Sequence, residues 1–208
     1  MVSPVSNIDL QPEPSTTDET RDRILDAAVN LFLEFGYRRT TIETVARRLG
    51  VSRVTVYRYF ADKTALFQAV LLRDFLRSAN SIEQHLNTLS IEQNPVIEGF
   101  VLAVTLARQQ PLIRRLLDTE PEWLILHMTL QGENMLQWAS ATSTAFLLQP
   151  KFKDWLKEND MTLAGELFVR LLQSAIHTPG GLLTSDNPDD LRRVAGYLIQ
   201  PLLRNPPQ

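Results

Sequence analysis

The stretch GVSRVTVYRYF, residues 50–60, constrains the fold of this 208-residue chain more than any other. Its β-branched residues favour a strand, but the punctuation around it favours a short helix. Gly50 follows one helical apolar pattern, and Ser52 is a good N-cap for a second helix. The preceding pattern is formed by Ile42, Val45, Ala46 and Leu49. Two short helices joined by so tight a turn predict a helix-turn-helix.

Helical spacing of apolar residues continues along the rest of the chain. Capping-box spacing at Thr16 with Glu19, and again at Thr40 with Glu43, marks two helix starts, and the second helix opens at Thr40 or Thr41. Prolines at positions 95, 111 and 121 fit the first turn of a helix. We expect an all-α protein of about nine helices, which run near residues 16–35, 41–49, 52–60, 63–85, 95–109, 111–119, 121–148 with a break near Gly132, 161–177 and 188–203.

Charge is distributed unevenly along the chain. The net charge is −3, which by itself argues against a nucleic-acid ligand. Residues 36–63, however, contain seven basic and two acidic residues, a net charge of +5 that leaves −8 for the remainder. A basic region on three short helices favours binding of a polyanion over a merely solvated face.

The predicted second helix of the helix-turn-helix is suited to the major groove of DNA. Val56 and Phe60 share one face and would hold the helix to its domain. Arg53, Tyr57 and Arg58 lie on other faces, where they could reach phosphates or base edges.

The segment TTIETVARRLGVSRVTVYRYFADKTALFQAVL, residues 40–71, closely resembles the DNA-binding domain of the tetracycline-repressor (TetR) family of one-component regulators. The resemblance covers about residues 20–75 and includes the FGY of residues 35–37, the threonine pair, the GVS turn and Lys63. It implies an N-terminal three-helix DNA-binding domain followed by a larger helical domain for ligand binding and dimerisation. Val54 and Tyr59 depart from the family pattern, where a small residue and a histidine are frequent.

The resemblance also implies DNA-contacting residues. Thr41, Tyr57 and Lys63 match phosphate-binding positions, and Arg53 is the best candidate to read a guanine. The complete predicted set is Thr41, Glu43, Thr44, Arg53, Val54, Thr55, Tyr57, Arg58, Tyr59 and Lys63.

Two further sites are predicted in the C-terminal two-thirds of the chain. A homodimer interface on the last two helices would use Leu163, Leu167, Leu171, Ser174, Leu191, Val194, Leu198 and Leu202. The alternative is that these faces pack within one subunit. Candidates for a pocket that takes a lipophilic effector are Phe100, Val104, Trp123, Leu126, His127, Leu130, Met135, Trp138, Phe146 and Phe168. Ordinary core packing is the alternative for them.

The predicted function is that of a homodimeric repressor that binds an inverted repeat in double-stranded DNA and is released by a small molecule. An activator of the same fold, a helical adaptor and an enzyme are the alternatives. His85, His127 and His177 lack metal-ligand spacing, cysteine is absent, and no catalytic motif is present. We therefore expect no metal, cofactor or catalytic residue.

We expect a disordered tail over residues 1–15, a DNA-binding domain over 16–65 and a ligand-binding and dimerisation domain over 66–208, with a helix at 63–85 that connects them. No membrane-span signal or export signal is seen, which favours the cytoplasm.

Overall fold

The computed structural model describes residues 16–90, 93–152, 161–178 and 180–199, and within these ranges it is all-helical. The described elements are α1 (Thr16–Arg39), α2 (Ile42–Leu49), α3 (Arg53–Tyr59), α4 (Lys63–Leu86), α5 (Pro95–Gln109), α6 (Pro111–Thr119), α7 (Pro121–Met128), α8 (Glu133–Leu147), the 3-10 helix η1 (Pro150–Phe152), α9 (Met161–His177), the 3-10 helix η2 (Leu182–Thr184) and α10 (Pro188–Ile199).

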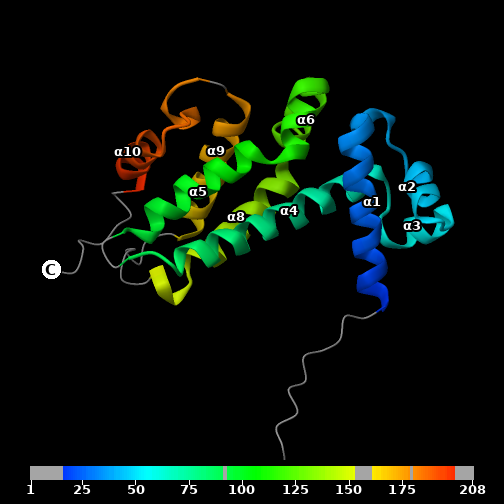
Figure 1. Ribbon diagram of the computed structural model, residues 1–208, viewed down its shortest axis with the longest axis horizontal. Coiled ribbons are helices and arrows are strands. Elements are labelled where there is room, and N and C mark those ends of the chain that lie inside the picture. Colours follow the sequence, from blue (N-terminus) through cyan, green and yellow to red (C-terminus); the bar gives the residue numbers. More distant parts are fainter. Residues whose placement is uncertain (1–15, 91–92, 153–160, 179, 200–208) are drawn as a thin grey trace, which may run out of the picture.

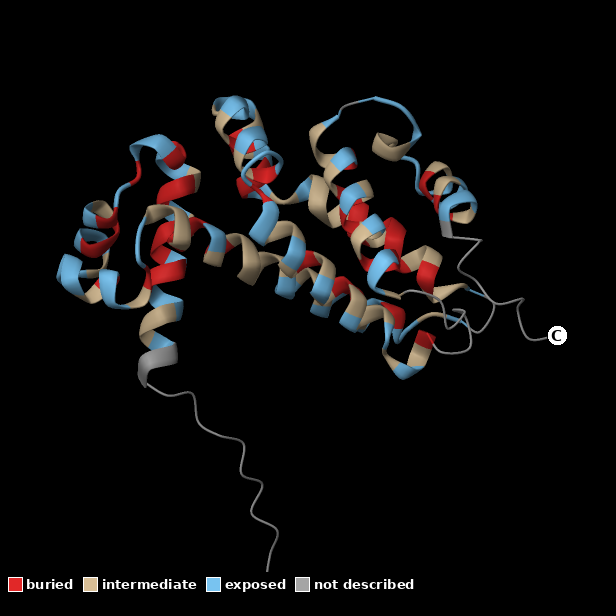
Figure 2. Cartoon of the chain, turned by 180° about the vertical axis from the view of Figure 1, so that it is seen from behind, coloured by how far each residue is buried: buried red, intermediate tan, exposed pale blue. Residues whose placement is uncertain are grey.

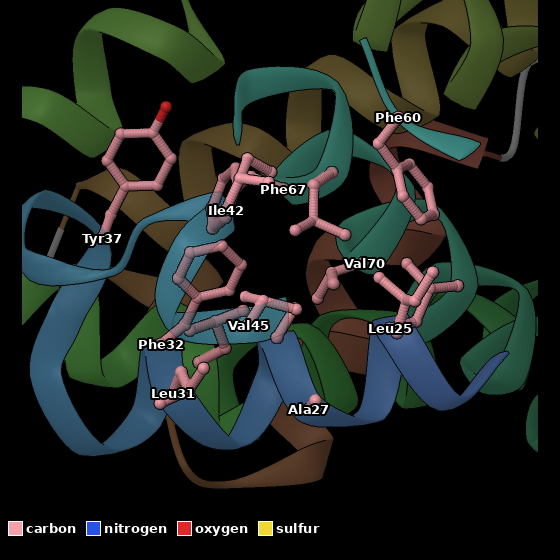
Figure 3. Packing of buried hydrophobic residues seen from close by; sticks show 14 of the residues in the cluster. Leu25, Ala27, Leu31, Phe32, Tyr37, Ile42, Val45, Phe60, Phe67 and Val70 are labelled. Carbon is pink, nitrogen blue, oxygen red and sulfur yellow. The ribbon is translucent and has the colours of Figure 1, made fainter. Parts of the chain in front are cut away.

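Helices α1, α2 and α3 form a small bundle at one end of the molecule (Figure 1). Its core is mainly apolar: Phe32, Val45 and Val56 are completely buried. The first turns of α4 belong to the same core, because Phe67 packs edge-on against Phe32 at 5.3 Å and Val70 lies beside it (Figure 3). The bundle is therefore fixed to the start of α4.

Helix α4 runs from this bundle along the larger helical body formed by α5, α8, α9 and α10 (Figure 1). A second buried cluster fills that body, with Phe100 and Phe152 each 1% exposed. In Figure 2 the buried and partly buried residues of these helices are red and tan. Helix α4 contributes Ile82 and Leu86 to the second cluster. One continuous helix thus has its first turns in one core and its last turns in the other.

Close packing of α8 against α9 depends on a glycine. A Cβ atom on Gly165 would overlap Thr144 Oγ1 and lie 2.9 Å from the Ser140 carbonyl oxygen. Helix α10 is tied to α5 by the Arg192 guanidinium, which donates to both carboxylate oxygens of Glu98 at 2.8 and 3.1 Å. The body therefore combines tight apolar contacts with a charged link at its end.

Most predicted helices are confirmed. The segment 121–148 is broken near Gly132, as predicted, and its two parts bring the number of described α-helices to ten. The first helix extends to Arg39 instead of ending at Phe35, although Gly36, at φ 79°, breaks its regular geometry where the C-terminal cap was predicted. The expectations for residues 1–15 and for 200–203 lie outside the described residues.

The structure decides between the two predicted starts of α2. Thr40 does not cap it, because the Thr40 hydroxyl is buried and donates to the Gly36 carbonyl at 2.8 Å. Thr41 is the N-cap instead.

No single described helix is both long and apolar enough to cross a membrane. Helices α5 and α6 meet that criterion only as a pair, and the pair is bent by 50°.

Candidate nucleic-acid interface and ligand cavity

The N-terminus of α2 is closed by a reciprocal pair of threonines. The Thr44 backbone N–H donates to Thr41 Oγ1 at 3.1 Å, and the Thr41 N–H donates to Thr44 Oγ1 at 2.9 Å. This is a capping box, with threonine in place of the usual Glu or Gln. The predicted phosphate-binding groups of Thr41 are thus engaged within the helix cap, at an exposed position.

The turn before α3 is set by Gly50 and Ser52. Gly50 ends α2 at φ 69°, in the left-handed region that favours glycine, and the Val51 N–H donates back to the Ala46 carbonyl at 3.0 Å. Ser52 Oγ then accepts from the Thr55 N–H at 3.1 Å, which starts α3. The β-branched stretch is therefore a helix, as predicted.

Helix α3 has one buried side and one exposed side. Val56 is fully buried and Phe60, just after the helix, is 4% exposed, so these two anchor it. Val54 is 77% exposed and Tyr57 52%. Arg53 and Arg58 are also exposed, and Arg53 makes only a long ion pair with Glu43, at 3.9 Å. The side chains of Arg53, Tyr57 and Arg58 are therefore accessible to a ligand on the outer side of α3.

Two predicted DNA contacts have internal roles in the structure. The Tyr59 ring packs partly against the apolar core, with the Arg58 guanidinium 5.4 Å from the ring centroid. Lys63 Nζ donates to the Tyr37 carbonyl at 3.0 Å and lies 4.1 Å from the centroid of the Tyr37 ring. Desolvation lowers the pKa of Lys63, an effect that the nearby carboxylate of Glu120 opposes. Lys63 thus holds the end of α1, and its predicted phosphate contact would require it to leave that position.

The N-terminal bundle meets α7 through a stack of rings. The Tyr37 and Trp123 ring centroids are 3.6 Å apart with planes inclined by 22°, and Trp123 stacks in turn on His127 at 4.2 Å. The Tyr37 hydroxyl hydrogen-bonds Thr64 Oγ1 at 3.1 Å. Burial raises the pKa of the Tyr37 phenol. Beside the stack, the Glu120 carboxylate accepts from the Arg38 backbone N–H. This contact joins the bundle to the body.

A cavity of about 450 Å³ lies inside the body, between α4, α5, α8 and α9. Five of the ten residues predicted for a pocket line it, namely Phe100, Met135, Trp138, Phe146 and Phe168. Whether they bind a ligand remains a prediction.

The other five predicted pocket residues lie outside this cavity. Val104 is fully buried in the core. Trp123 and His127 turn toward Tyr37, because α7 places them on the side of the N-terminal bundle. Leu126 and Leu130 are exposed, the latter at 86%. Helical spacing alone did not show which side of α7 faces inward.

Large apolar side chains are exposed on both α9 and α10, among charged residues such as Arg170 and Arg192. Leu167 is 48% exposed, Leu198 42% and Tyr197 78%. Of the predicted dimer residues, Leu163, Leu167, Ser174 and Leu198 are exposed and Leu171 and Val194 are partly so. Leu191 is a correction: it is 2% exposed because it packs in its own subunit's core. Leu202 lies outside the described residues.

Comparison with known proteins shows which family the N-terminal bundle is similar to. A family model described as bacterial regulatory proteins, tetR family, matches residues 24–70, which span α2, α3 and the core of the N-terminal bundle. The chain is thus similar to TetR-family transcriptional regulators, and these relatives are regulators rather than enzymes.

Two relatives match this chain well beyond residues 24–70. The transcriptional repressor BepR of Brucella suis is 26% identical over 79% of this chain and 95% of its own length. The regulator AlkX of Mycobacterium tuberculosis is 29% identical, covering 76% and 75% respectively. The solved structure of the AlkX repressor from Dietzia, implicated in n-alkane biodegradation, is 25% identical with a TM-score of 0.65, covering 87% and 93%.

Two residues that the sequence did not predict, Glu120 and Asp74, lie at the junction and at the cavity. Glu120 reads as an ordinary helix-start charge beside Pro121, and nothing local connects it to Arg38, 82 residues away. Asp74 lines the cavity, and a signal for it existed. It follows Val70 by four residues and Phe67 by seven, so it continues the buried face of α4. Within the described residues, no group of His, Cys, Asp and Glu could hold a metal ion.

Proposed function

We propose that this protein is a homodimeric repressor that binds an inverted repeat and is released by a lipophilic effector bound in the body cavity. In this proposal residues 16–65 bind DNA, residues 66–208 bind the effector and dimerise, and the protein acts in the cytoplasm. Repression rather than activation is supported by BepR and the Dietzia AlkX, which are both repressors.

The observation that carries the proposal is the division of α3 into two faces. Its inner residue Val56 is fully buried, while Arg53, Tyr57 and Arg58 project outward from a region with a net charge of +5. A helix of this kind fits the major groove, where arginine pairs with guanine and other polar groups bind phosphates. The exposed hydroxyl-bearing end of α2, at Thr41, lies in the same motif and supports a phosphate contact.

The dimer is supported by the exposed leucines of α9 and α10. Leu167 and Leu198 are large side chains that remain almost half exposed in the single chain. Burying these side chains against a second copy gives a two-fold pair of recognition helices, which is what two half-sites one turn of DNA apart require.

Effector control is supported by the course of α4. The same helix carries Phe67 in the N-terminal core and Phe75 on the wall of the cavity. A ligand that binds one position of α4 better than another would shift the two α3 helices of a dimer relative to each other.

Selection of bound sequences from a random DNA pool at low salt tests the first part. We expect an enriched inverted repeat. A pool without an enriched palindrome would refute the assignment of a palindromic operator.

A pair of arginine variants then tests the recognition helix. Arg53→Ala should weaken operator binding by about 1–3 kcal/mol and relax the preference at one base position. Arg48→Ala is the matched control, because Arg48 pairs with Glu34 at 2.9 Å and the net charge changes equally. A uniform loss across all sequences for Arg53→Ala would instead make Arg53 a phosphate contact.

Sedimentation of the purified protein tests the dimer. Leu167→Glu should shift it toward monomer, whereas Leu130→Glu, at an exposed leucine off the α9–α10 face, should not. Equal behaviour of the two variants would contradict the assigned interface.

A further inference from the structure

The cavity in the body is apolar and rich in aromatic rings, and its wall carries a single kind of charge. The rings belong to Phe75, Phe100, Trp138, Phe146, Phe152 and Phe168. Among the described residues that line the cavity, Asp74 is the one ionisable side chain. Lysine, arginine and histidine are all missing from that described lining. A ligand inside therefore meets π-faces and one carboxylate.

The Asp74 carboxylate is only weakly neutralised by the protein. Its Oδ2 accepts a hydrogen bond from Gln110 Nε2 at 2.6 Å, and this donor is a neutral amide. Its described ion pair, from Oδ1 to Arg77 Nη1, measures 4.0 Å, and the arginine side chain is 62% exposed. An ion pair that is so long and so exposed to solvent does little to neutralise the carboxylate. The carboxylate is itself 21% exposed and borders an apolar space, where a second positive charge would be favourable.

We infer that the effector is a lipophilic cation, an amine or quaternary ammonium with an apolar body, whose charge is recognised by Asp74. This inference rests on the proposed effector role of the cavity and specifies its chemistry. Aromatic faces attract cations as well as apolar groups, so the rings and the carboxylate select the same ligand. An anionic ligand of the same shape would face Asp74 with no compensating cation on the described wall.

The position of Asp74 couples the binding of a cation in the cavity to the DNA-binding domain. Gln110 is the N-cap of α6, where its Oε1 accepts from the Ile113 N–H at 2.6 Å while its Nε2 holds Asp74. A cation at Asp74 would compete with Gln110 for the carboxylate. It would thereby loosen the link between α4 and the start of α6.

A shift at the start of α6 would also displace α1, because α6 packs against α1. Leu112, Ile113 and Leu116 are buried in the same cluster as Ile24 and Phe32 of the N-terminal bundle. Recognition of charge in the cavity is thus connected to the placement of the bundle through one amide side chain.

Calorimetry with three ligands of one chain length tests the inference on the full-length protein. Decyltrimethylammonium and decanoate, each below its micelle concentration, and decanol, below its solubility limit, share one alkyl chain length and differ mainly in the charge of the head group. We expect the ammonium to bind about tenfold more tightly than decanol, and decanoate to bind most weakly.

The test of Asp74 is the variant Asp74→Asn, which keeps the side-chain shape and an oxygen that can accept from Gln110. It should lose about tenfold in affinity for the ammonium and stay within about twofold for decanol. Asp118→Asn is the matched control, because it removes the same charge from an exposed position on α6. It should leave all three affinities unchanged, and circular dichroism verifies that both variants are folded.

The outcomes separate this inference from the proposed function. Equal binding of ammonium and decanol, or an unchanged ammonium affinity in Asp74→Asn, would overturn the assigned cation while the effector role of the cavity stands. The ammonium could bind in a manner that depends on Asp74 and yet leave the affinity for the operator unchanged. That result would support cation recognition by Asp74 and refute effector control. Failure of all three ligands to bind would overturn both.

Discussion

The carboxylate of Glu120 accepts the backbone N–H of Arg38 through both of its oxygens, at 3.2 Å for Oε1 and 3.0 Å for Oε2. The contact joins the first residue before α7 to the last turn of α1, directly beside Gly36. A Cβ atom at residue 36 would overlap Glu120 Oε1, so the glycine permits this approach as well as its own φ of 79°. Backbone and side chain thus fix the angle at which the DNA-binding domain meets the body.

Replacing this carboxylate should weaken that junction. Glu120→Gln keeps one acceptor but loses the charge, and we expect about 1–3 kcal/mol less free energy of unfolding, because hydrogen bonds to charged groups are the strong ones. Chemical denaturation measures the change. Glu122→Gln, at an exposed side chain in the first turn of α7, is the control and should stay close to wild type. Equal stability of both variants would show that the junction does not depend on Glu120.

The contact between α8 and α9 should not tolerate an added methyl group. In Gly165→Ala the new Cβ meets Thr144 Oγ1 and the Ser140 carbonyl, so the helices must separate. We expect a loss of about 1–3 kcal/mol, measured as a lower midpoint of thermal unfolding. Gly196→Ala is a useful comparison, since nothing lies within 4 Å of a Cβ there. A midpoint for Gly165→Ala as high as that of Gly196→Ala would contradict the close approach.

Stability should fall in mild acid because of His177. Burial lowers the pKa of this imidazole, whose Nε2 lies 3.4 Å from Met128 Sδ. The unfolded chain therefore binds a proton more readily than the folded one. The contribution is present above the ordinary histidine pKa of about 6.5 and is lost as the pH falls below it.

Denaturation of wild type and His177→Gln at pH 7.5 and 5.5 measures the difference. The variant should show a smaller loss of unfolding free energy between the two pH values. An identical pH dependence in both proteins would assign the acid sensitivity to other groups.

Substitutions of two valines of α3 should differ in their effects on stability and on DNA recognition. Val54→Ala should change the unfolding free energy by no more than about 0.5 kcal/mol, because 77% of the side chain is exposed, yet alter the base preference of the operator. Val56→Ala removes two buried carbon atoms and should cost about 2 kcal/mol. Denaturation and repeated selection from a random DNA pool measure the two effects. An unchanged operator for Val54→Ala would place this residue outside the DNA interface.

Local sequence signals determined the helices of this protein and its DNA-binding motif. These signals are the apolar spacing, Gly50, Ser52 and the prolines that open α5, α6 and α7. Each affects the backbone conformation only of residues close to it in the sequence, so its effect can be predicted from the sequence. The same local rules predicted the break near Gly132 and the exposed outer face of α3. They left Thr40 and Thr41 open as the start of α2, and Thr41 is the cap because the Thr40 hydroxyl is held in the core by hydrogen bonds to the Leu31 and Gly36 carbonyls.

Only the tertiary structure decided which side of each helix meets which neighbour. Apolar periodicity says that a face is buried but not what buries it, so Trp123 and His127 were predicted for the pocket and stack instead on Tyr37. Leu191 was likewise predicted for the dimer and is buried in its own subunit. The pairs Arg38–Glu120 and Asp74–Gln110 link residues 82 and 36 positions apart. Such contacts follow from the packing of whole helices, which no short stretch of sequence specifies.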